Sequence, residues 1–273
     1  MRQNLCKIFI FHNKRGSGFL IKLFKNSEPF YCLMTNEHVI TKKCIKDRIK
    51  IEVYYNYEDE KIEISLNPEE RFIKDFRDYS IDATVIQILP EDNIQNDYFL
   101  LPFKDYMDDY ERFKDEDITI IQYPKGKMNY SNGQIIGLTG KTKYEFSYNA
   151  STDEGSSGSP IILKDTKNVI GIHKEGNIII KNENENIKVN LGDFIWPIHC
   201  YFKNLNDSKN EAEKKGKRKE FINNNNPNLI NDINIIYNIK EEKINNNIIH
   251  KNNLSSDQLN KMIIIYEVPD KKI

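Results

Sequence analysis

Short runs of β-forming residues fill the first 200 residues, and this pattern constrains the fold more than any other feature of the chain. Each run is about five to seven residues long, rich in Ile, Val, Tyr and Phe, and bounded by Gly, Asn, Asp or Pro. No long segment with helical periodicity separates them, so the pattern predicts an all-β barrel or sandwich and not a layered α/β fold. The predicted strands are Leu5–Phe11, Gly18–Phe24, Phe30–Thr35, Ile49–Tyr55, Ile62–Leu66, Ala83–Leu89, Ile118–Tyr123, Gly133–Leu138, Tyr144–Tyr148, Pro160–Leu163, Val169–His173 and Ile178–Lys181.

One helix is predicted at the end of this region. Trp196 and Pro197 form a favourable first turn, because proline at the first helical position lacks only an N–H that has no partner there. The apolar residues that follow would share one face of the helix; they are Ile198, Tyr201, Phe202 and Leu205.

The composition changes after about residue 205. Residues 209–220 contain Ala212 as their one apolar residue, and residues 223–226 are four consecutive asparagines, which cannot build a core. Two later runs, 233–239 and 262–268, are typical of strands. We therefore expect a domain over residues 1–205 and a linker with an Asn/Ile-rich extension of unknown role over residues 206–273.

The balance of positive and negative charges limits the kinds of partner that this chain is expected to bind. The 40 Lys and Arg residues face 41 Asp and Glu residues, for a net charge of −1, which argues against binding to nucleic acid or to anionic membranes. A basic cluster at residues 214–219 leaves a nucleic-acid or nuclear-localisation patch as an alternative, but Glu211, Glu213 and Glu220 flank it.

Targeting segments and cysteine spacing point to the cytoplasm. The apolar run at the N-terminus is interrupted by Lys7, unlike a signal peptide, and no stretch reaches the roughly 18 apolar residues of a membrane span. The cysteines show neither a C-x-x-C spacing nor a metal-site spacing, so we expect reduced thiols and no metal or organic cofactor. They are Cys6, Cys32, Cys44 and Cys200.

The run Gly-Ser-Ser-Gly-Ser-Pro from Gly155 to Pro160 is the strongest chemical motif. A serine nucleophile needs backbone N–H donors directed at the carbonyl oxygen that it attacks, and therefore a tight turn. Gly155 and Gly158 permit such a turn on either side of the serines. Taken alone, the run is also compatible with a flexible loop.

A nucleophilic serine needs a base, and the base needs an acid that orients it. Among the five histidines, His38 directly follows a predicted apolar strand, where a rigid core can hold its ring. Asp82 lies between Ile81 and Ala83 at the start of another strand, and a buried carboxylate there needs a partner. Asp75 and Asp78 lie in a polar stretch that is more typical of a solvated loop.

Taken together, these segments resemble the trypsin-like (chymotrypsin-fold) serine peptidases. The resemblance rests on the order His38, Asp82, Ser157, on Thr-Asn-Glu-His-Val-Ile around His38 and on Gly-Ser-Ser-Gly-Ser-Pro around Ser157. The separations of 44 and 75 residues are similar to those of the glutamyl endopeptidase and high-temperature-requirement branches. The resemblance covers residues 5–205 and is supported by the segments 16–20, 82–85 and 169–173.

The resemblance implies two six-stranded antiparallel β-barrels with the active site between them. It implies that Ser157 is the nucleophile, His38 the general base and Asp82 the orienting acid, with an acyl-enzyme intermediate. The backbone N–H groups of Gly155 and Ser157 would form the oxyanion hole. The expected substrate is a peptide or protein.

Two positions depart from the family pattern. Digestive trypsins carry an aspartate before the nucleophile that pairs with a new N-terminus after zymogen cleavage, whereas this chain carries Ser156. We therefore expect no activation by that salt bridge. Thr84 stands two residues after Asp82, where the family usually has an apolar residue.

The same resemblance implies which residues contact the side chain on the acyl side of the scissile bond (P1). Ser151 and Thr152 would line one wall of the pocket, and His173 and Gly176 the other. Glutamyl endopeptidases place a Thr and a His at these positions, so an acidic P1 residue is the hypothesis. Nearby carboxylates argue against it if they face the cleft; they belong to Asp153, Glu154 and Glu175.

Two other functions remain open at this stage. One is a catalytically silent scaffold that binds peptides in the cleft, although such a scaffold has no need of three triad residues. The other is a signalling or defence module whose peptidase domain is activated by a partner bound to residues 206–273. The sequence leaves the oligomeric state undetermined.

Overall fold

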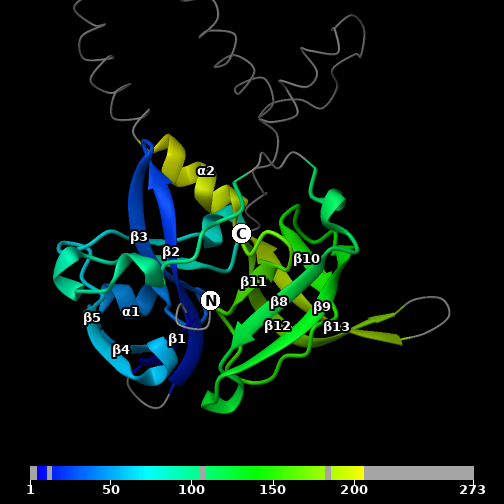
Figure 1. The fold of residues 1–273 in the computed structure, drawn as a ribbon, viewed down its shortest axis with the longest axis horizontal. Coiled ribbons are helices and arrows are strands. Elements are labelled where there is room, and N and C mark those ends of the chain that lie inside the picture. The colour runs from blue at the N-terminus through cyan, green and yellow to red at the C-terminus, as the bar shows by residue number, and fades with distance from the viewer. Residues whose placement is uncertain (1–4, 11–13, 105–108, 182–185, 206–273) are drawn as a thin grey trace, which may run out of the picture. The chain divides into compact units, whose positions relative to one another are not determined.

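The computed structural model describes residues 5–10, 14–104, 109–181 and 186–205. The remaining residues, drawn in grey in Figure 1, lie outside the described residues. The predicted strands 233–239 and 262–268 and the extension 206–273 therefore stay predictions.

The N-terminal half is an antiparallel sheet of seven strands in the order β5-β4-β1-β2-β3-β7-β6 (Figure 1). A one-turn helix, α1 (Lys42–Lys46), follows β3. The strands are β1 (Leu5–Ile10), β2 (Lys14–Lys25), β3 (Glu28–Thr35), β4 (Lys50–Tyr55), β5 (Glu60–Ser65), β6 (Ile73–Asp75) and β7 (Thr84–Gln87).

The C-terminal half is a closed six-stranded antiparallel barrel in the order β10-β13-β12-β11-β8-β9. It is followed by helix α2 (Trp196–Asn204). The strands are β8 (Asp117–Gln122), β9 (Asn129–Leu138), β10 (Glu145–Tyr148), β11 (Pro160–Leu163), β12 (Val169–Lys181) and β13 (Asn186–Phe194). Short 3₁₀ turns lie at Asn56–Glu58, Arg77–Tyr79, Pro90–Asp92, Asn96–Tyr98, Glu111–Phe113 and Pro124–Gly126.

The structure confirms the all-β class, the chymotrypsin-like arrangement and the C-terminal helix. The strand count of the first half was wrong: it is a seven-stranded sheet whose two edges, β5 and β6, are not joined. The second half is the six-stranded barrel that was expected. Its β12 continues through the predicted gap between His173 and Ile178 by means of bulges against β13.

One hydrophobic core joins the two halves. Phe19, Met34 and Val85 from the first sheet belong to the same buried cluster as Ile162 and Ile172 from the barrel. Each half also has a smaller apolar cluster of its own. The shared core fixes the two halves against each other, so residues carried by both can form one site.

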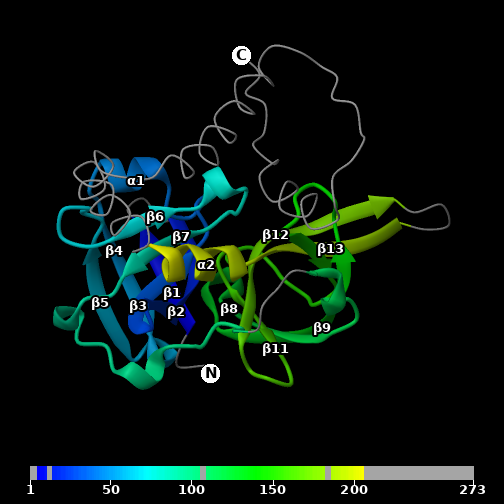
Figure 2. The same ribbon diagram turned by 90° about the horizontal axis from the view of Figure 1, so that it is seen from above.

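Helix α2 lies against the N-terminal half, as the second view shows (Figure 2). Its Phe202 is completely buried, and its ring centroid lies 4.9 Å from that of Phe30 and 5.4 Å from that of Phe72. The chain therefore returns to its first half after completing the barrel.

Candidate active site

A cleft of about 550 Å³ lies where the two halves meet. His38 and Asp82 come from loops of the N-terminal half, and the other lining residues come from the C-terminal half. They are Thr152, Asp153, Glu154, Gly155, Ser157, His173, Lys174, Glu175, Gly176 and Asn177. The cleft thus brings together the three residues predicted to act in catalysis and most of those predicted to bind substrate.

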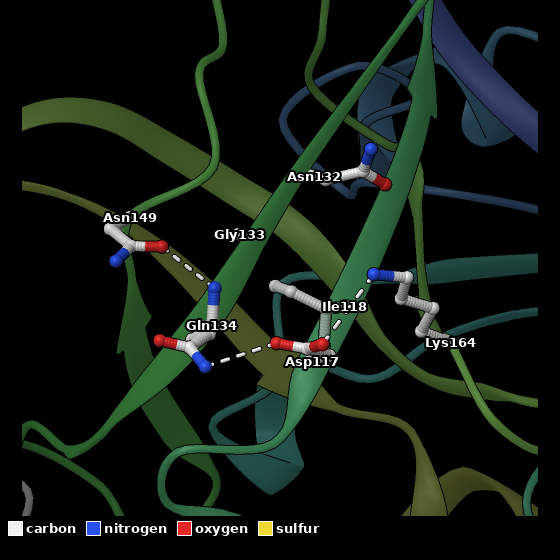
Figure 3. A pocket seen from close by; sticks show the side chains of 7 residues that line it. All are labelled: Asp117, Ile118, Asn132, Gly133, Gln134, Asn149 and Lys164. Carbon is white, nitrogen blue, oxygen red and sulfur yellow. Dashed lines mark hydrogen bonds and ion pairs between the residues drawn. The ribbon is translucent and has the colours of Figure 1, made fainter.

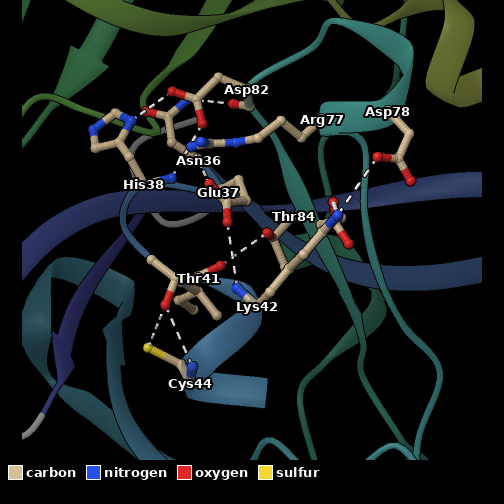
Figure 4. A network of polar contacts seen from close by, with 12 residues as sticks. Asn36, Glu37, His38, Thr41, Lys42, Cys44, Arg77, Asp78, Asp82 and Thr84 are labelled. Carbon is tan, nitrogen blue, oxygen red and sulfur yellow. Dashed lines mark hydrogen bonds and ion pairs between the residues drawn. The ribbon is translucent and has the colours of Figure 1, made fainter. Parts of the chain in front are cut away.

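His38 lies in the turn that follows β3. The Asn36 carbonyl closes this turn by accepting the backbone N–H groups of Val39 and Ile40, at 3.2 and 3.1 Å. The Asn36 side chain donates to the backbone carbonyl of Asp82 at 2.6 Å (Figure 4). This bond fixes the His38 turn to the segment that carries the acid.

Asp82 precedes β7 and accepts two hydrogen bonds from His38. The His38 ring Nδ1 lies 2.5 Å from Oδ2, and the His38 backbone N–H donates to Oδ1 at 3.1 Å. Burial favours the neutral acid, but the bonds from His38 outweigh it, and the pKa of Asp82 lies below its ordinary value. Asp82 is therefore ionised at neutral pH and holds Nδ1 as the protonated nitrogen.

A second layer of charges surrounds this pair (Figure 4). The buried Glu37 forms an ion pair with Arg77 and accepts the Lys42 backbone N–H at 3.3 Å. Lys42 Nζ lies 3.4 Å from Asp75 and 3.5 Å from Asp78, so these aspartates face Lys42. The expectation of a solvated loop is wrong for Asp75, which lies in β6 with a mostly buried side chain.

Ser157 lies in a tight turn between two glycines with positive φ. Gly155 has φ +91° and Gly158 has φ +89°, a region that favours glycine. A Cβ atom on Gly158 would collide with the carbonyl oxygen of Ser17. Ser17 also donates its backbone N–H to the Ser157 carbonyl at 2.9 Å, so β2 of the first half holds the turn in place.

The peptide between Glu154 and Gly155 has a defined orientation. The Glu154 carbonyl accepts the Lys125 N–H at 2.7 Å, and the Gly155 carbonyl accepts the Ser17 hydroxyl at 2.7 Å. Because the N–H of a trans peptide points away from its C=O, the Gly155 N–H points away from Lys125. Among the described residues, the N–H groups of Gly155 and Ser157 have no hydrogen-bond acceptor within the protein.

Three of the residues predicted to bind substrate line one region of the cleft. The ring Nδ1 of His173 lies 2.5 Å from the hydroxyl of Tyr148. Burial lowers the pKa of His173 to about 4, although a hydrogen bond to the Leu191 carbonyl acts in the opposite direction and raises it. The Thr152 hydroxyl is buried and has no hydrogen-bond partner in the described ranges of the chain. A Cβ on Gly176 would lie 2.7 Å from that hydroxyl, so the glycine keeps this space open.

Ser151 does not line the cleft. Its carbonyl accepts hydrogen bonds from Gln122 Nε2 at 2.9 Å and from Ser131 Oγ at 2.7 Å, and the residue lines a neighbouring pocket instead. Thr152 and Asp153 line both pockets and separate them.

A third pocket lies on the barrel near β8 and β9 and contains no predicted site residue (Figure 3). Its polar groups bind one another: Gln134 Nε2 donates to Asp117 at 3.0 Å, and Lys164 lies 3.5 Å from the same carboxylate.

In the described part of the chain, no group of three or more His, Cys, Asp or Glu side chains is arranged to hold a metal.

Sequence reasoning missed three charged residues behind Asp82: Glu145, Lys174 and Asp193. They lie on three different strands of the barrel, β10, β12 and β13. No linear motif connects them. The one available signal is the unusual placing of a lysine directly after the buried His173.

Residues 16–172 match the family described as trypsin-like peptidase domain. Among solved structures, Deg5 has 16% identity and a TM-score of 0.50, and the match covers 72% of this chain and 86% of that chain. A serine endoprotease from Yersinia pestis has 14% identity, coverage of 72% and 60%, and a TM-score of 0.49. The active form of the Rv3671c protease from M. tuberculosis has 16% identity, coverage of 71% and 76%, and a TM-score of 0.46.

The similarity to Deg5 concerns the fold. No curated protein matches the sequence significantly. None of the helices in the described ranges has the length and apolar character needed to cross a membrane.

Proposed function

The chain belongs to the trypsin-like peptidase family and is a serine-type endopeptidase; from this premise we propose that Ser157, His38 and Asp82 form its catalytic triad. The observation that carries the proposal is the cleft itself. It holds a histidine bonded at 2.5 Å to a carboxylate, and a serine on a glycine-bounded turn. The substrate is a peptide or protein.

The proposed reaction begins with attack of Ser157 Oγ on the scissile carbonyl carbon. Because Nδ1 of His38 donates to Asp82, Nε2 accepts the proton that Ser157 loses. The resulting imidazolium gives this proton to the leaving amine as the C–N bond breaks. Water then hydrolyses the acyl-enzyme by the same steps, with His38 again as base and acid.

The N–H groups of Gly155 and Ser157 are proposed to bind the negative oxygen that develops during attack. Their support is the fixed Glu154–Gly155 peptide and the lack of an internal acceptor within the described residues. Donors that are already oriented stabilise the transition state without reorganisation.

An acidic P1 residue is proposed for the pocket formed by Thr152, His173 and Gly176. Tyr148 has a pKa raised well above its ordinary value by burial, so its hydroxyl stays protonated and can donate to Nδ1 of His173. The neutral His173 then carries its proton on Nε2. The His173 ring also makes a hydrogen bond to the Leu191 carbonyl, so the Thr152 hydroxyl, which has no partner among the described residues, is the donor available to a carboxylate.

Labelling with a fluorophosphonate probe tests the triad. We expect labelling of the wild-type protein, no labelling of Ser157→Ala, and a rate reduced by roughly 10³-fold or more in His38→Ala. Asp78→Asn, which removes an exposed carboxylate bonded to Lys42, serves as the matched control and should label normally. A folded wild-type protein that does not label would contradict the proposal and favour the silent or partner-activated alternative.

A panel of peptides that differ only at P1 tests the pocket. We expect faster cleavage after Glu than after Gln, Lys or Leu. Asp153, Glu154 and Glu175 also line the cleft, although Asp153 is paired with Lys125 at 2.6 Å. Fastest cleavage after Lys would show that these carboxylates, and not Thr152 and His173, determine specificity.

A further inference from the structure

Three charged side chains form a cluster directly behind the candidate triad acid. The Lys174 ammonium lies 2.5 Å from Glu145 Oε2 and 3.5 Å from Asp193 Oδ1. The exposed fractions of the Glu145 and Asp193 side chains are 3% and 0%, against 23% for Lys174. The second oxygen of Glu145 accepts the Thr139 hydroxyl at 2.6 Å.

The barrel brings these residues together through strand register. Glu145 on β10 pairs with Asp193 on β13, and Asp193 pairs in turn with Ile172 on β12. A bulge follows His173 on β12, and Lys174 at this bulge reaches both carboxylates. The meeting of the three charges therefore depends on the alignment of three strands.

The cluster contacts the triad through the backbone of Asp82. The Asp82 N–H donates to Asp193 Oδ2 at 2.8 Å, across 111 residues of sequence and from one half of the fold to the other. Asp82 is thus held on two sides, by Asp193 at its backbone N–H and by the Asn36 amide at its carbonyl. These two bonds fix the main chain from which the carboxylate reaches His38.

Packing alone does not explain this arrangement. Burial raises the pKa of Asp193 to about 6, against the favourable effects of Lys174 and the Asp82 N–H. The charged groups that face it are Lys174, Glu145 and Asp82. Buried ion clusters of this kind are often no more stable than apolar side chains of the same size. A residue that is costly to bury and bonded to a catalytic segment is better explained by function.

We propose that Asp193, paired with Lys174, which is itself bonded to Glu145, is a positioning residue that fixes the Asp82 backbone so that its carboxylate orients His38. The inference rests on the proposed triad. Asp193 touches no substrate atom in this role, so its loss should lower kcat and leave KM nearly unchanged.

The test compares Asp193→Ala with Asp193→Asn. The alanine variant removes the acceptor for the Asp82 N–H, and we expect kcat to fall by roughly 10- to 100-fold, as for a displaced catalytic group. The asparagine variant keeps an oxygen at this position and should recover most of kcat. The NMR resonance of the proton between His38 and Asp82, far downfield in a short hydrogen bond, should weaken or shift in Asp193→Ala and persist in Asp193→Asn.

The matched control is the buried pair of Arg71 and Asp92, whose side chains are 6% and 7% exposed and which lies outside the cleft. Asp92→Asn should lose stability without a change in kcat or in the resonance. An Asp193→Ala protein that is folded, with wild-type kcat and an unchanged resonance, would overturn the inference, as would an effect confined to KM. If the fluorophosphonate probe does not label the wild-type protein, the proposed function fails. The NMR resonance of the proton between His38 and Asp82 would still report whether Asp193 positions Asp82.

Discussion

Gly155 shows at the scale of single residues how the backbone prepares the cleft for chemistry. Its positive φ and the hydrogen bonds accepted by the Glu154 carbonyl and by its own carbonyl orient the N–H that we propose as an oxyanion donor. A side chain here would have to tolerate both a strained φ and a contact of 2.8 Å between Cβ and the Tyr123 carbonyl.

Gly155→Ala should therefore lower kcat by roughly 10²- to 10³-fold, the usual effect of losing one oxyanion-hole donor. Gly140→Ala is a suitable control, because Gly140 also has positive φ but has no atom within 4 Å of its hypothetical Cβ. Steady-state kinetics on both proteins checks this. Equal kcat values in the two variants would show that strain alone, and not the position of the N–H, accounts for any loss.

Two buried titratable groups should give opposite pH dependences of stability. His173 has its pKa lowered from 6.5 to about 4, so the unfolded chain binds a proton there first and acidification destabilises the fold. Asp193 has its pKa raised from 3.8 to about 6, so the folded chain keeps a proton and acidification stabilises it. Between pH 6 and 4 the two contributions, about 3 kcal/mol each, oppose one another.

Single substitutions should separate these contributions. As the pH falls from 6 to 4, the unfolding free energy of His173→Gln should rise relative to wild type, and that of Asp193→Asn should fall. Urea unfolding across this range measures both. Parallel curves for the three proteins would mean that neither group titrates in the folded state as described.

The sequence indicated the triad candidates because each lies in a short motif with its own chemistry, such as the serine between Gly155 and Gly158. The cluster behind Asp82 had no such motif. Glu145, Lys174 and Asp193 meet only through the pairing of three strands, and pairing register is not visible in one sequence. Ser151 was placed in the wrong pocket for the same reason. Its surroundings depend on how β8 and β9 pack beside it, which one sequence does not show.

At the scale of elements, strands with continuous apolar runs were predicted well and polar strands were missed. The Pro160–Leu163 strand was predicted with its observed bounds, whereas β13 was missed although Val189 and Leu191 are buried and alternate with polar residues. The buried Asn190 and Asp193 interrupt its apolar character, so the strand shows no continuous apolar run. Helix α1 was missed because five residues are too few to show a period.

Helix α2 illustrates an element that is stabilised by packing. Phe202→Ala should lower the unfolding free energy by about 3–5 kcal/mol, since it leaves a cavity beside Phe30 and Phe72. Lys203→Ala, at an exposed position of the same helix, should change it by less than about 0.5 kcal/mol. Denaturant unfolding monitored by circular dichroism measures both, and similar values would contradict the assigned packing.

At the scale of the whole described fold, the shared core makes the two halves thermodynamically dependent. Phe19 and Met34 of the sheet pack in the same cluster as Ile162 and Ile172 of the barrel. The site inherits this dependence, because its histidine and its serine belong to different halves. A change that separates the halves would disassemble the proposed triad without altering any of its residues.

The two halves should accordingly unfold together. Trp196, the one tryptophan of the chain, packs against the barrel cluster and reports on that half by fluorescence. The unfolding midpoint measured by Trp196 fluorescence should coincide with the midpoint measured by far-UV circular dichroism, which averages over both halves. Ile21→Val, in the shared core, should move both midpoints equally; two separate transitions would contradict the single core.

The return of α2 to the first sheet has a consequence for biosynthesis. A ribosome makes the N-terminal half first, but Phe30 and Phe72 stay uncovered until Phe202 has emerged. The turn that carries Ser157 is likewise made long before the last strand of the barrel, β13, which holds Asp82 through Asp193. Because β13 and α2 are the last elements of the domain to be made, we expect the proposed active site to be completed only after both have left the ribosome.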